Sequence, residues 1–257
     1  LPNILNDAGY RTLNAGKYHT QPETAYHFEE YIKTTAPVDM AEQCRPLIES
    51  KADAPFFLCF CTTEPHRKFQ REGSDPIDPA SLPVPSHLPD IPECRQELSE
   101  YYMSIQRADS GLVRLMEILK SSGHWEDTLI VFVSDNGMPW PGAKTTLYEP
   151  GINLPCVMRD PGNERKGYAC DAMVSWVDIA PTVLDYCGVQ PPEKVQGRSA
   201  IAARRGKTID STSRIVASVS VQSGASPPRI EVSETPAISG WKRRSSSASP
   251  VPLSTLI

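Results

Sequence analysis

Apolar and polar residues along this chain follow two patterns, a spacing of three or four residues that is typical of helices and continuous apolar runs that are typical of buried strands. The longest helical pattern covers residues 96–121, where apolar side chains recur every three or four positions. Its members are Leu98, Tyr101, Tyr102, Ile105, Ala108, Leu112, Leu115, Met116 and Leu119. Gly123 follows, and a glycine just past a periodic segment commonly ends a helix. The pattern therefore predicts a long amphipathic helix.

Continuous apolar runs predict strands that are buried on both faces of a sheet. The two longest are residues 55–61 and residues 128–134, which are rich in aromatic or β-branched side chains. Shorter apolar segments at residues 10–15, 154–158 and 172–177 predict three more strands.

Three further helices are predicted from capping residues and apolar spacing. They cover residues 1–8 with Gly9 as the cap, residues 38–50, and Pro181 to Tyr186 with Gly188 as the cap. Residues 70–95 are rich in proline and aspartate, which indicates a long ordered loop. Helices that alternate with apolar strands are typical of layered α/β proteins. The sequence therefore predicts an α/β fold.

The last fifth of the chain has a different composition. Residues 204–257 are crowded with serine and proline and carry 8 Lys or Arg against 3 Asp or Glu, so their net charge is +5 and residues 1–203 are left with −10. We expect a folded domain over 1–203 and a basic, disordered tail over 204–257, with the alternation from Arg214 to Val221 as its one possible strand. The basic cluster at 242–244 is a short solvated charge run in this interpretation, so no nucleic-acid partner is expected.

The 7 cysteines are odd in number and include no C-x-x-C pair, so they indicate neither a zinc site nor a disulfide framework. Cys59 and Cys61 lie two apart in a predicted strand and would share one face. No stretch has the length and apolarity of a membrane span. The segment that starts at Leu1 has neither a basic nor a hydrophobic leader region, and since Leu1 is not methionine we expect the true N-terminus to be missing and assign no localisation.

The candidate chemistry begins where the strand at 128–134 ends. The apolar run breaks into Asp135, Asn136 and Gly137. Asp-Asn-Gly is a common turn sequence, so a turn is the simplest interpretation. Carboxylate and amide oxygens at the carboxyl end of a buried strand are also typical ligands of Ca²⁺ or Mg²⁺.

Other polar residues lie at or just after the ends of predicted strands. They are Lys17, His19, His66 and Lys144. Taken singly, each is more often an ordinary surface residue than part of a site. Together with a divalent-cation site at one edge of a sheet, two lysines and two histidines suit a tetrahedral anion such as sulfate or phosphate.

Five blocks of this sequence occur in the order found in sulfatases, and the chain resembles that family over about residues 1–200. The blocks are Gly9 to His19, Pro55 to Leu58 followed by Pro65 and His66, Ser134 to Gly137, Lys144 to Gly151, and Asp178 to Leu184. Within the family, the stretch from Asp135 to Lys144 and the Pro65-His66-Arg67 block look most like the N-sulfoglucosamine sulfohydrolases, the heparan N-sulfatases.

The resemblance implies an alkaline-phosphatase-like fold, in which helices sandwich a mixed, largely parallel sheet. It also implies that Asp135 and Asn136 are two ligands of the family's Ca²⁺, with Mg²⁺ as a possible replacement. The implied substrate is a sulfated small molecule or a glycosaminoglycan. Members of the family are often secreted, periplasmic or lysosomal.

The resemblance further implies roles for the basic residues. Lys17, Lys144 and His66 match groups that bind the sulfuryl oxygens and assist the leaving group, and His19 matches the histidine beside the catalytic aldehyde hydrate. Cations at sulfuryl oxygens stabilise charge in a transition state, and an imidazole can move protons near neutral pH. In the family the hydrate is a formylglycine, made from Cys or Ser in a C/S-x-P-x-R motif.

The sequence departs from the family at that motif. The family places it, and two aspartates that complete the metal site, upstream of the block that begins this chain. Cys44 to Ile48 imitates it only as far as proline, and Ala225 to Arg229 has alanine where Cys or Ser is required. We therefore reject Cys44 as the nucleophile. We expect a chain that is incomplete at both ends, through truncation or a shifted reading frame, and inactive alone.

Three hypotheses follow for the function. The first is a sulfatase, a hydrolase of sulfate esters or sulfamates, represented by an incomplete chain. The second is a non-catalytic descendant that binds sulfated glycans through Lys17, Lys144 and the two histidines. The third is a phosphoesterase of the same superfamily, which the block from Lys144 to Gly151 makes less favourable. We favour the first.

Overall fold

The computed structural model describes residues 1–50, 54–164, 167, 169–170, 172–201 and the backbone of 214–220. Its strands are β1 (Arg11–Gly16), β2 (Glu30–Ile32), β3 (Phe56–Cys61), β4 (Thr128–Val133), β5 (Cys156–Arg159) and β6 (Arg214–Ser220). They form one sheet in the order β2-β1-β3-β6-β4-β5. Neighbours in this sheet are parallel except for the antiparallel pair of β4 and β5.

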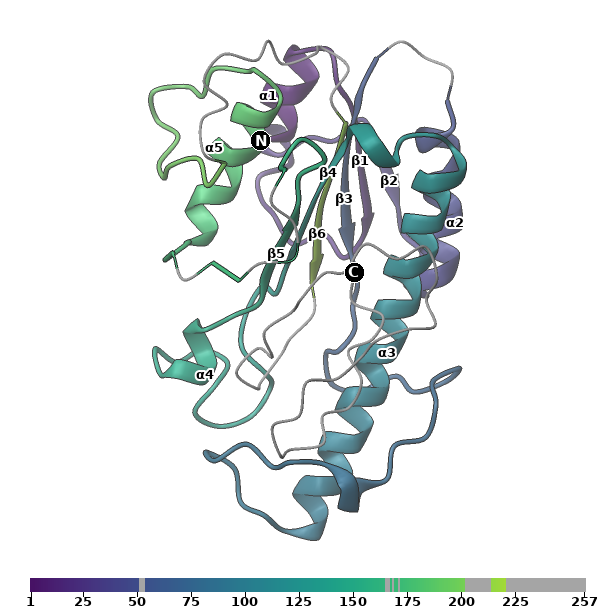
Figure 1. Cartoon of the computed structure of the whole chain (residues 1–257), viewed down its shortest axis with the longest axis vertical. Coiled ribbons are helices and arrows are strands. Elements are labelled where there is room, and N and C mark those ends of the chain that lie inside the picture. The colour runs from purple at the N-terminus through teal and green to yellow at the C-terminus, as the bar shows by residue number, and fades with distance from the viewer. Residues whose placement is uncertain (51–53, 165–166, 168, 171, 202–213, 221–257) are drawn as a thin grey trace.

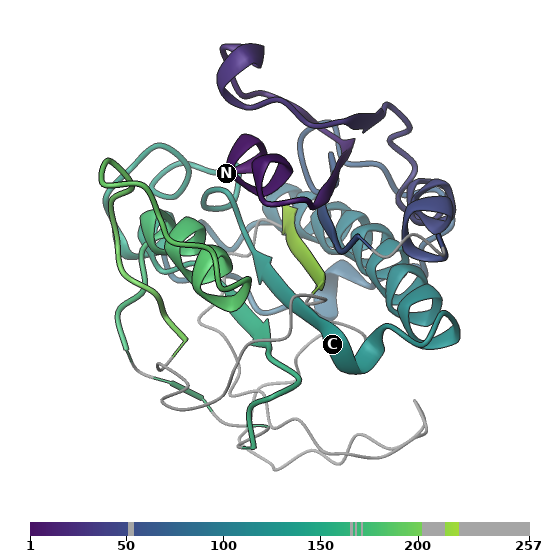
Figure 2. The same cartoon turned by 90° about the horizontal axis from the view of Figure 1, so that it is seen from above.

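Helices cover both faces of the sheet (Figures 1 and 2). On one face lie α2 (Pro37–Ile48) and the long α3 (Pro92–Ser121), and on the other lie α1 (Pro2–Asp7) and α5 (Ile179–Tyr186). The short α4 (Glu149–Ile152) and four 3₁₀ turns, Glu23–Ala25, Pro79–Ser81, Trp125–Asp127 and Trp176–Asp178, complete the described helical elements. The predicted mixed, largely parallel α/β sheet between helices is confirmed.

The hydrophobic core is split into two parts by the sheet. Because side chains alternate along a strand, Phe56, Leu58 and Phe60 of β3 pack in the cluster with α2 and α3, while Phe57 faces the cluster of α1 and α5. All four of these side chains are at most 1% exposed. This two-sided burial explains why β3 and β4 read as continuous apolar runs in the sequence.

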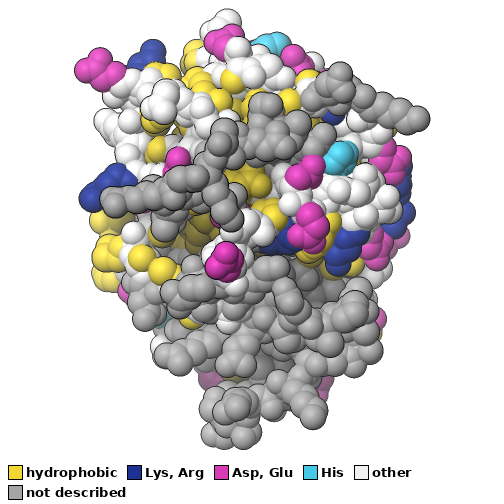
Figure 3. All heavy atoms as spheres, turned by 45° about the horizontal axis from the view of Figure 1, so that its top comes forward, with side chains coloured by type: hydrophobic (Ala, Val, Ile, Leu, Met, Phe, Trp, Pro, Cys, Tyr) yellow, Lys and Arg dark blue, Asp and Glu magenta, His cyan; other side chains and the backbone are white. Residues whose placement is uncertain are grey.

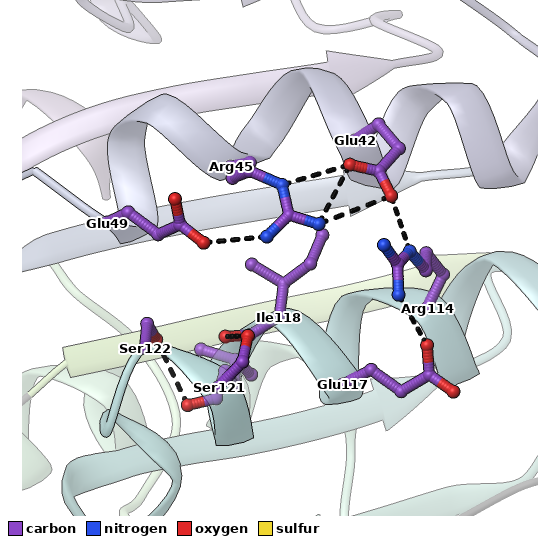
Figure 4. Close-up of polar contacts among 9 residues, drawn as sticks. Glu42, Arg45, Glu49, Arg114, Glu117, Ile118, Ser121 and Ser122 are labelled. Carbon is purple, nitrogen blue, oxygen red and sulfur yellow. Dashed lines mark hydrogen bonds and ion pairs between the residues drawn. The ribbon is translucent and has the colours of Figure 1, made fainter.

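The outer surfaces of α2 and α3 are joined by alternating charges. Figure 4 shows Arg45 between Glu42 and Glu49 on α2, and Arg114 of α3 between Glu42 and Glu117. Figure 3 shows the same mixture of positive and negative side chains on the right of the molecule, where these helices lie in Figure 1. These exposed pairs order the helix surface, whereas burial of the apolar side of α3 supplies the stabilisation.

Most predicted elements lie within a few residues of their observed bounds, but the strand predicted at 172–177 is wrong. In the structure Ser175 N–H donates to Asp178 Oδ2 at 2.9 Å, and Trp176–Asp178 is a 3₁₀ turn that leads into α5. The apolar side chains that suggested a strand are solvent-accessible instead, with Met173 completely exposed. Local capping by Asp178 therefore outweighs the short apolar pattern.

Two other predictions are refined. The long helix begins at Pro92 rather than at residue 96, since proline fits the first helical turn. The Arg214–Val221 alternation forms β6, whose backbone lies between β3 and β4; the rest of the expected disordered tail, 204–213 and 221–257, lies outside the described residues. None of the helices described here has the length and apolarity needed to cross a membrane.

Candidate active site

The carboxyl end of β1 is tied to the carboxyl end of β3. Gly16 pairs with Cys61 in the sheet and has φ +85°, a conformation that favours glycine. A Cβ at Gly16 would lie only 2.2 Å from the Cys61 carbonyl oxygen, so no larger residue fits. Directly afterwards, Lys17 N–H donates to that same oxygen at 2.8 Å. Lys17 therefore leaves the sheet at a fixed place beside β3.

The carboxyl end of β4 leads into a bend that side-chain hydrogen bonds hold in place. Ser134 is fully buried, and its hydroxyl donates to the Asn136 carbonyl at 2.7 Å. The Asn136 amide donates to Asp135 Oδ1 at 2.8 Å. Gly137 packs so closely against α4 that a Cβ there would lie 2.4 Å from Pro150 O. Asp135 and Asn136 thus form a bend, and this bend holds Asp135 at the edge of the sheet.

These two strand ends bring Lys17 and Asp135 together. Lys17 Nζ lies 3.4 Å from Asp135 Oδ2, and the residues are 118 positions apart in the sequence. The side chains are 24% and 43% exposed, respectively. The distance is long for a charge-assisted hydrogen bond, so both groups keep capacity for an external ligand. The sequence-based expectation that these two residues share one edge is confirmed.

A hard cation suits part of this site. A carboxylate and an amide oxygen are the donor types that Ca²⁺ and Mg²⁺ prefer, and Asp135 and Asn136 supply one of each, although here the Asn136 amide nitrogen faces the Asp135 carboxylate. Ca²⁺ takes about six to eight oxygen ligands, so two residues make an incomplete set. Across the described part of the chain, no cluster of three or more His, Cys, Asp or Glu residues could hold a metal ion.

His66 lies on the loop that follows β3. Its N–H donates to Thr63 O at 3.0 Å, and its Nδ1 lies 2.5 Å from Arg67 O, which fixes an exposed ring at the same edge of the sheet. The preceding Glu64 is 4% exposed and accepts from Arg107 Nε of α3 at 3.2 Å. This buried ion pair anchors the loop that carries His66.

Lys144 and His19 make no direct hydrogen bond to Lys17 or Asp135 among the described residues. Lys144 lies on the loop after β4, where its N–H donates to Met138 O at 3.1 Å, and its side chain is partly exposed. His19 is exposed, two residues beyond Lys17. Among the hydrogen bonds of the described residues, neither side chain reaches Lys17 or Asp135. The structure thus joins Lys17, Asp135 and Asn136 directly, and places the other three on adjacent loops.

Arg67 is a site neighbour whose contacts the sequence did not predict. Its guanidinium donates twice to Pro139 O, at 3.2 and 3.0 Å, and also pairs with Glu97 of α3. The guanidinium carbon lies 5.0 Å from the centre of the Trp140 ring and 5.5 Å from that of Phe69. Arg67 therefore links the His66 loop, the loop after β4 and α3. The arginine and the two aromatic residues lie in irregular loops, so no periodic pattern in the sequence predicts their contact.

The cysteine that imitates the nucleophile motif lies in the core. Cys44 is fully buried in α2, and burial raises the pKa of its thiol to about 12. A neutral thiol in such a place is unreactive, which agrees with its rejection as the nucleophile. The similar stretch from Ala225 to Arg229 lies outside the described residues.

Comparison with a family model and with curated proteins identifies the same family in each case. The family model described as sulfatase matches residues 1–189. The human N-sulphoglucosamine sulphohydrolase is 31% identical over 225 residues, which cover 75% of this chain and 45% of the human protein. An ulvan-active sulfatase from Formosa agariphila is 29% identical over 124 residues, covering 48% of this chain and 21% of that protein.

A solved structure supports the same fold. The phosphonate monoester hydrolase from Silicibacter pomeroyi superposes with a TM-score of 0.53 at 17% identity, covering 77% of this chain and 60% of that one. The present chain spans less than half the length of the two curated relatives above.

Proposed function

The chain belongs to the sulfatase family, and we propose on that basis that the protein hydrolyses a sulfate ester or a sulfamate of a sulfated sugar. One observation carries the proposal: Lys17 and Asp135, from two family blocks 118 residues apart, lie 3.4 Å from each other at the carboxyl edge of the sheet. Ligand sites of open α/β sheets gather at this edge.

Each basic residue of the site has a separate task in this proposal. Lys17 and Lys144 bind the sulfuryl oxygens as cations, and their charges stabilise the negative charge that grows there in the transition state. His66 binds the same group and assists departure of the leaving group, and His19 moves a proton near the attacking group. The exposed rings of both histidines leave them accessible to a substrate.

Asp135 and Asn136 would hold a Ca²⁺ ion, or Mg²⁺ in its place, together with ligands from outside this pair. When bound, the ion would hold a sulfuryl oxygen and neutralise its charge. The residues of this chain do not supply the family's formylglycine, because the sequence contains no C/S-x-P-x-R motif. No residue of this chain is assigned as the nucleophile.

The substrate class follows from the relatives. One is named for N-sulphoglucosamine and another for ulvan. We expect a sulfated sugar or glycosaminoglycan, with the sulfamate of N-sulfoglucosamine as the first compound to test. A phosphoester is the second candidate, because a phosphonate monoester hydrolase shares the fold and a phosphoryl group presents the same tetrahedral oxygens to the two lysines.

Sulfate release by the full-length protein that contains these residues tests the proposal. N-sulfoglucosamine and a phosphate monoester are compared as substrates for the parent protein, for Lys144→Ala and for Lys194→Ala. Lys194 is an exposed lysine beyond α5 and serves as the matched control. We expect sulfate release that falls at least about tenfold in Lys144→Ala, the size of one lost charge-assisted contact, and is unchanged in Lys194→Ala.

The other hypotheses give different results in the same assay. Preferred cleavage of the phosphate ester would support the phosphoesterase. Binding of the sulfated sugar without turnover in the full-length protein would support the non-catalytic glycan-binding descendant.

A further inference from the structure

Arg67 connects two loops of the candidate active site. It lies on the loop after β3, and its side chain bonds to the loop after β4, which carries Lys144. Its own loop is anchored to α3 twice, by the pair of Arg67 with Glu97 and by the pair of the buried Glu64 with Arg107. Arg67 therefore extends from a loop whose position relative to α3 is fixed.

The guanidinium of Arg67 holds two consecutive residues of the loop after β4. Its Nε and one terminal nitrogen donate to Pro139 O, at 3.2 and 3.0 Å. Its central carbon lies 5.0 Å from the centre of the Trp140 ring. Trp140 is only 7% exposed, and its ring meets that of the fully buried Tyr101 of α3 edge to face, with 5.1 Å between the ring centres. One side chain thus fixes both Pro139 and Trp140.

Backbone hydrogen bonds extend this restraint from Trp140 to Lys144. The N–H groups of Trp140 and Lys144 both donate to Met138 O, at 2.8 and 3.1 Å, and Ala143 N–H donates to Trp140 O at 3.2 Å. Met138 and Ala143 are completely buried. Because these bonds close the loop on itself, a shift of Trp140 would move the backbone of Lys144 with it.

The contacts of Arg67 favour a supporting role over direct binding of an anion. All three nitrogens of its guanidinium already donate within the protein, to Pro139 O and to Glu97. The Glu97 carboxylate also offsets the positive charge that an anion would need. The Lys144 ammonium has no such partner among the described residues, so its charge remains available to a ligand.

We propose that Arg67 is a positioning residue, which sets the place of Lys144 relative to His66 so that both basic groups reach one sulfuryl group. Arg67 itself does not touch the substrate. Groups that bind a reacting centre are effective only when the residues behind them hold them in place. This inference rests on the proposed function, because that function makes Lys144 and His66 the ligands of the sulfuryl group.

A double-mutant cycle on sulfate affinity tests this role. Inorganic sulfate is titrated calorimetrically into the full-length protein, Arg67→Ala, Lys144→Ala and the double variant. We expect sulfate to bind about fivefold more weakly to Arg67→Ala than to the parent protein. In the Lys144→Ala background the same change should weaken binding by less than about twofold, because residues that act through one another have non-additive effects.

Two further variants separate positioning from charge. Arg67→Lys keeps the charge opposite Glu97 but lacks the planar fork that donates from two nitrogens to Pro139 O, so we expect about threefold weaker sulfate binding. Arg71→Ala is the matched control, since Arg71 lies on the same loop and pairs with Glu100 of α3. Among the described residues Arg71 makes no hydrogen bond to the loop after β4, and its loss should leave sulfate affinity unchanged.

Equal losses of sulfate affinity with and without Lys144 would make Arg67 an independent ligand of the anion and overturn the proposal. Unchanged sulfate affinity in Arg67→Ala, whatever its melting temperature, would make the residue purely structural and overturn it as well. The same cycle with Arg67→Lys decides the matter should Arg67→Ala not fold.

The proposed function and the positioning role can fail separately, because these titrations need no turnover. Non-additive losses in a protein that releases no sulfate from its substrates would reject only the activity. Additive losses in a protein that does release sulfate would reject only the positioning role, and absence of sulfate binding by the parent protein would reject both.

Discussion

The two ends of strand β4 are built in opposite ways. At the amino end, Thr128 is fully buried and donates to His124 O at 2.6 Å. Beside it, Arg159 donates to Trp125 O at 2.6 Å, and its guanidinium carbon lies 3.8 Å from the centre of the Trp125 ring. At the carboxyl end, Asp135 is 43% exposed and is paired with Lys17 at 3.4 Å.

This difference separates an end whose polar groups bond within the protein from the end at which we propose the site. The polar groups at the amino end are bonded at short distances to the protein itself, so they have little left to offer a ligand. The residues at the carboxyl end are held in place by hydrogen bonds to backbone carbonyls, while their charged atoms remain partly accessible. The same division is expected of parallel sheets, whose ligands bind beyond the carboxyl ends of the strands.

The largest loss of stability is expected in the core that holds both ends. Leu112 of α3 is 3% exposed, so Leu112→Ala should lower the free energy of unfolding by about 2–4 kcal/mol. Leu147 is 89% exposed, and Leu147→Ala should change it by less than about 0.5 kcal/mol. Chemical denaturation measures both. Equal midpoints for the two variants would show that the apolar stripe of α3 is not core.

A smaller loss is expected at the amino end of β4. Arg159→Ala removes a donor from two carbonyls, Trp125 O and Thr128 O, and a cation from the Trp125 ring. We expect destabilisation of about 1–3 kcal/mol. Glu126, the partner of Arg159, is 73% exposed, and Glu126→Ala should cost less than about 0.5 kcal/mol. Thermal unfolding measures the stability of both variants. If Arg159→Ala were as stable as the parent protein, the contrast between the two ends of β4 would be lost.

At the carboxyl end of β4 we expect the opposite result, a loss of ligand affinity with little loss of stability. Lys17→Ala breaks an exposed pair, so the free energy of unfolding should change by less than about 0.5 kcal/mol. Sulfate affinity of the full-length protein should fall about tenfold, the value of one charge-assisted contact. Titration calorimetry and denaturation of the same variant measure both quantities. A large loss of stability with unchanged sulfate affinity would make Lys17 structural.

The smallest effect is expected in the protein interior, where burial should suppress the reactivity of the Cys44 thiol. Burial raises the pKa of Cys44 to about 12, so at about pH 8 its thiolate is scarce. Cys170 is exposed. Alkylation followed by peptide mass spectrometry should modify Cys170 first and leave Cys44 almost untouched in the native protein. Rapid modification of Cys44 without unfolding would contradict its buried position.

The elements that the sequence predicted correctly are those with long patterns. The strands β3 and β4 were visible because both of their faces are buried, and α3 because its apolar stripe extends over many turns. The segment at 172–177 was misjudged because its apolar residues are few and exposed, while Asp178 caps the turn through backbone hydrogen bonds. A short apolar run cannot reveal such a local competitor.

The part of the site that could be predicted from the sequence is the part that lies directly at strand ends. Lys17 and Asp135 each follow a strand, and parallel strands bring such residues to one edge. The stacking of Arg67 on Trp140 depends on the paths of two irregular loops, so no spacing in the sequence encodes it. The boundary expected at residue 203 remains a prediction, and so do the roles of all the predicted site residues, which are Lys17, His19, His66, Asp135, Asn136 and Lys144.

Calorimetric titration of Ca²⁺ into the full-length protein and into its Asp135→Ala variant tests the central claim most directly, because that claim makes the carboxyl end of β4 a cation-dependent sulfuryl site. We predict that Ca²⁺ binds the parent protein and stabilises it against heat, and that Asp135→Ala abolishes both effects while remaining folded. Equal Ca²⁺ binding by the two proteins would exclude Asp135 as a ligand and contradict the account.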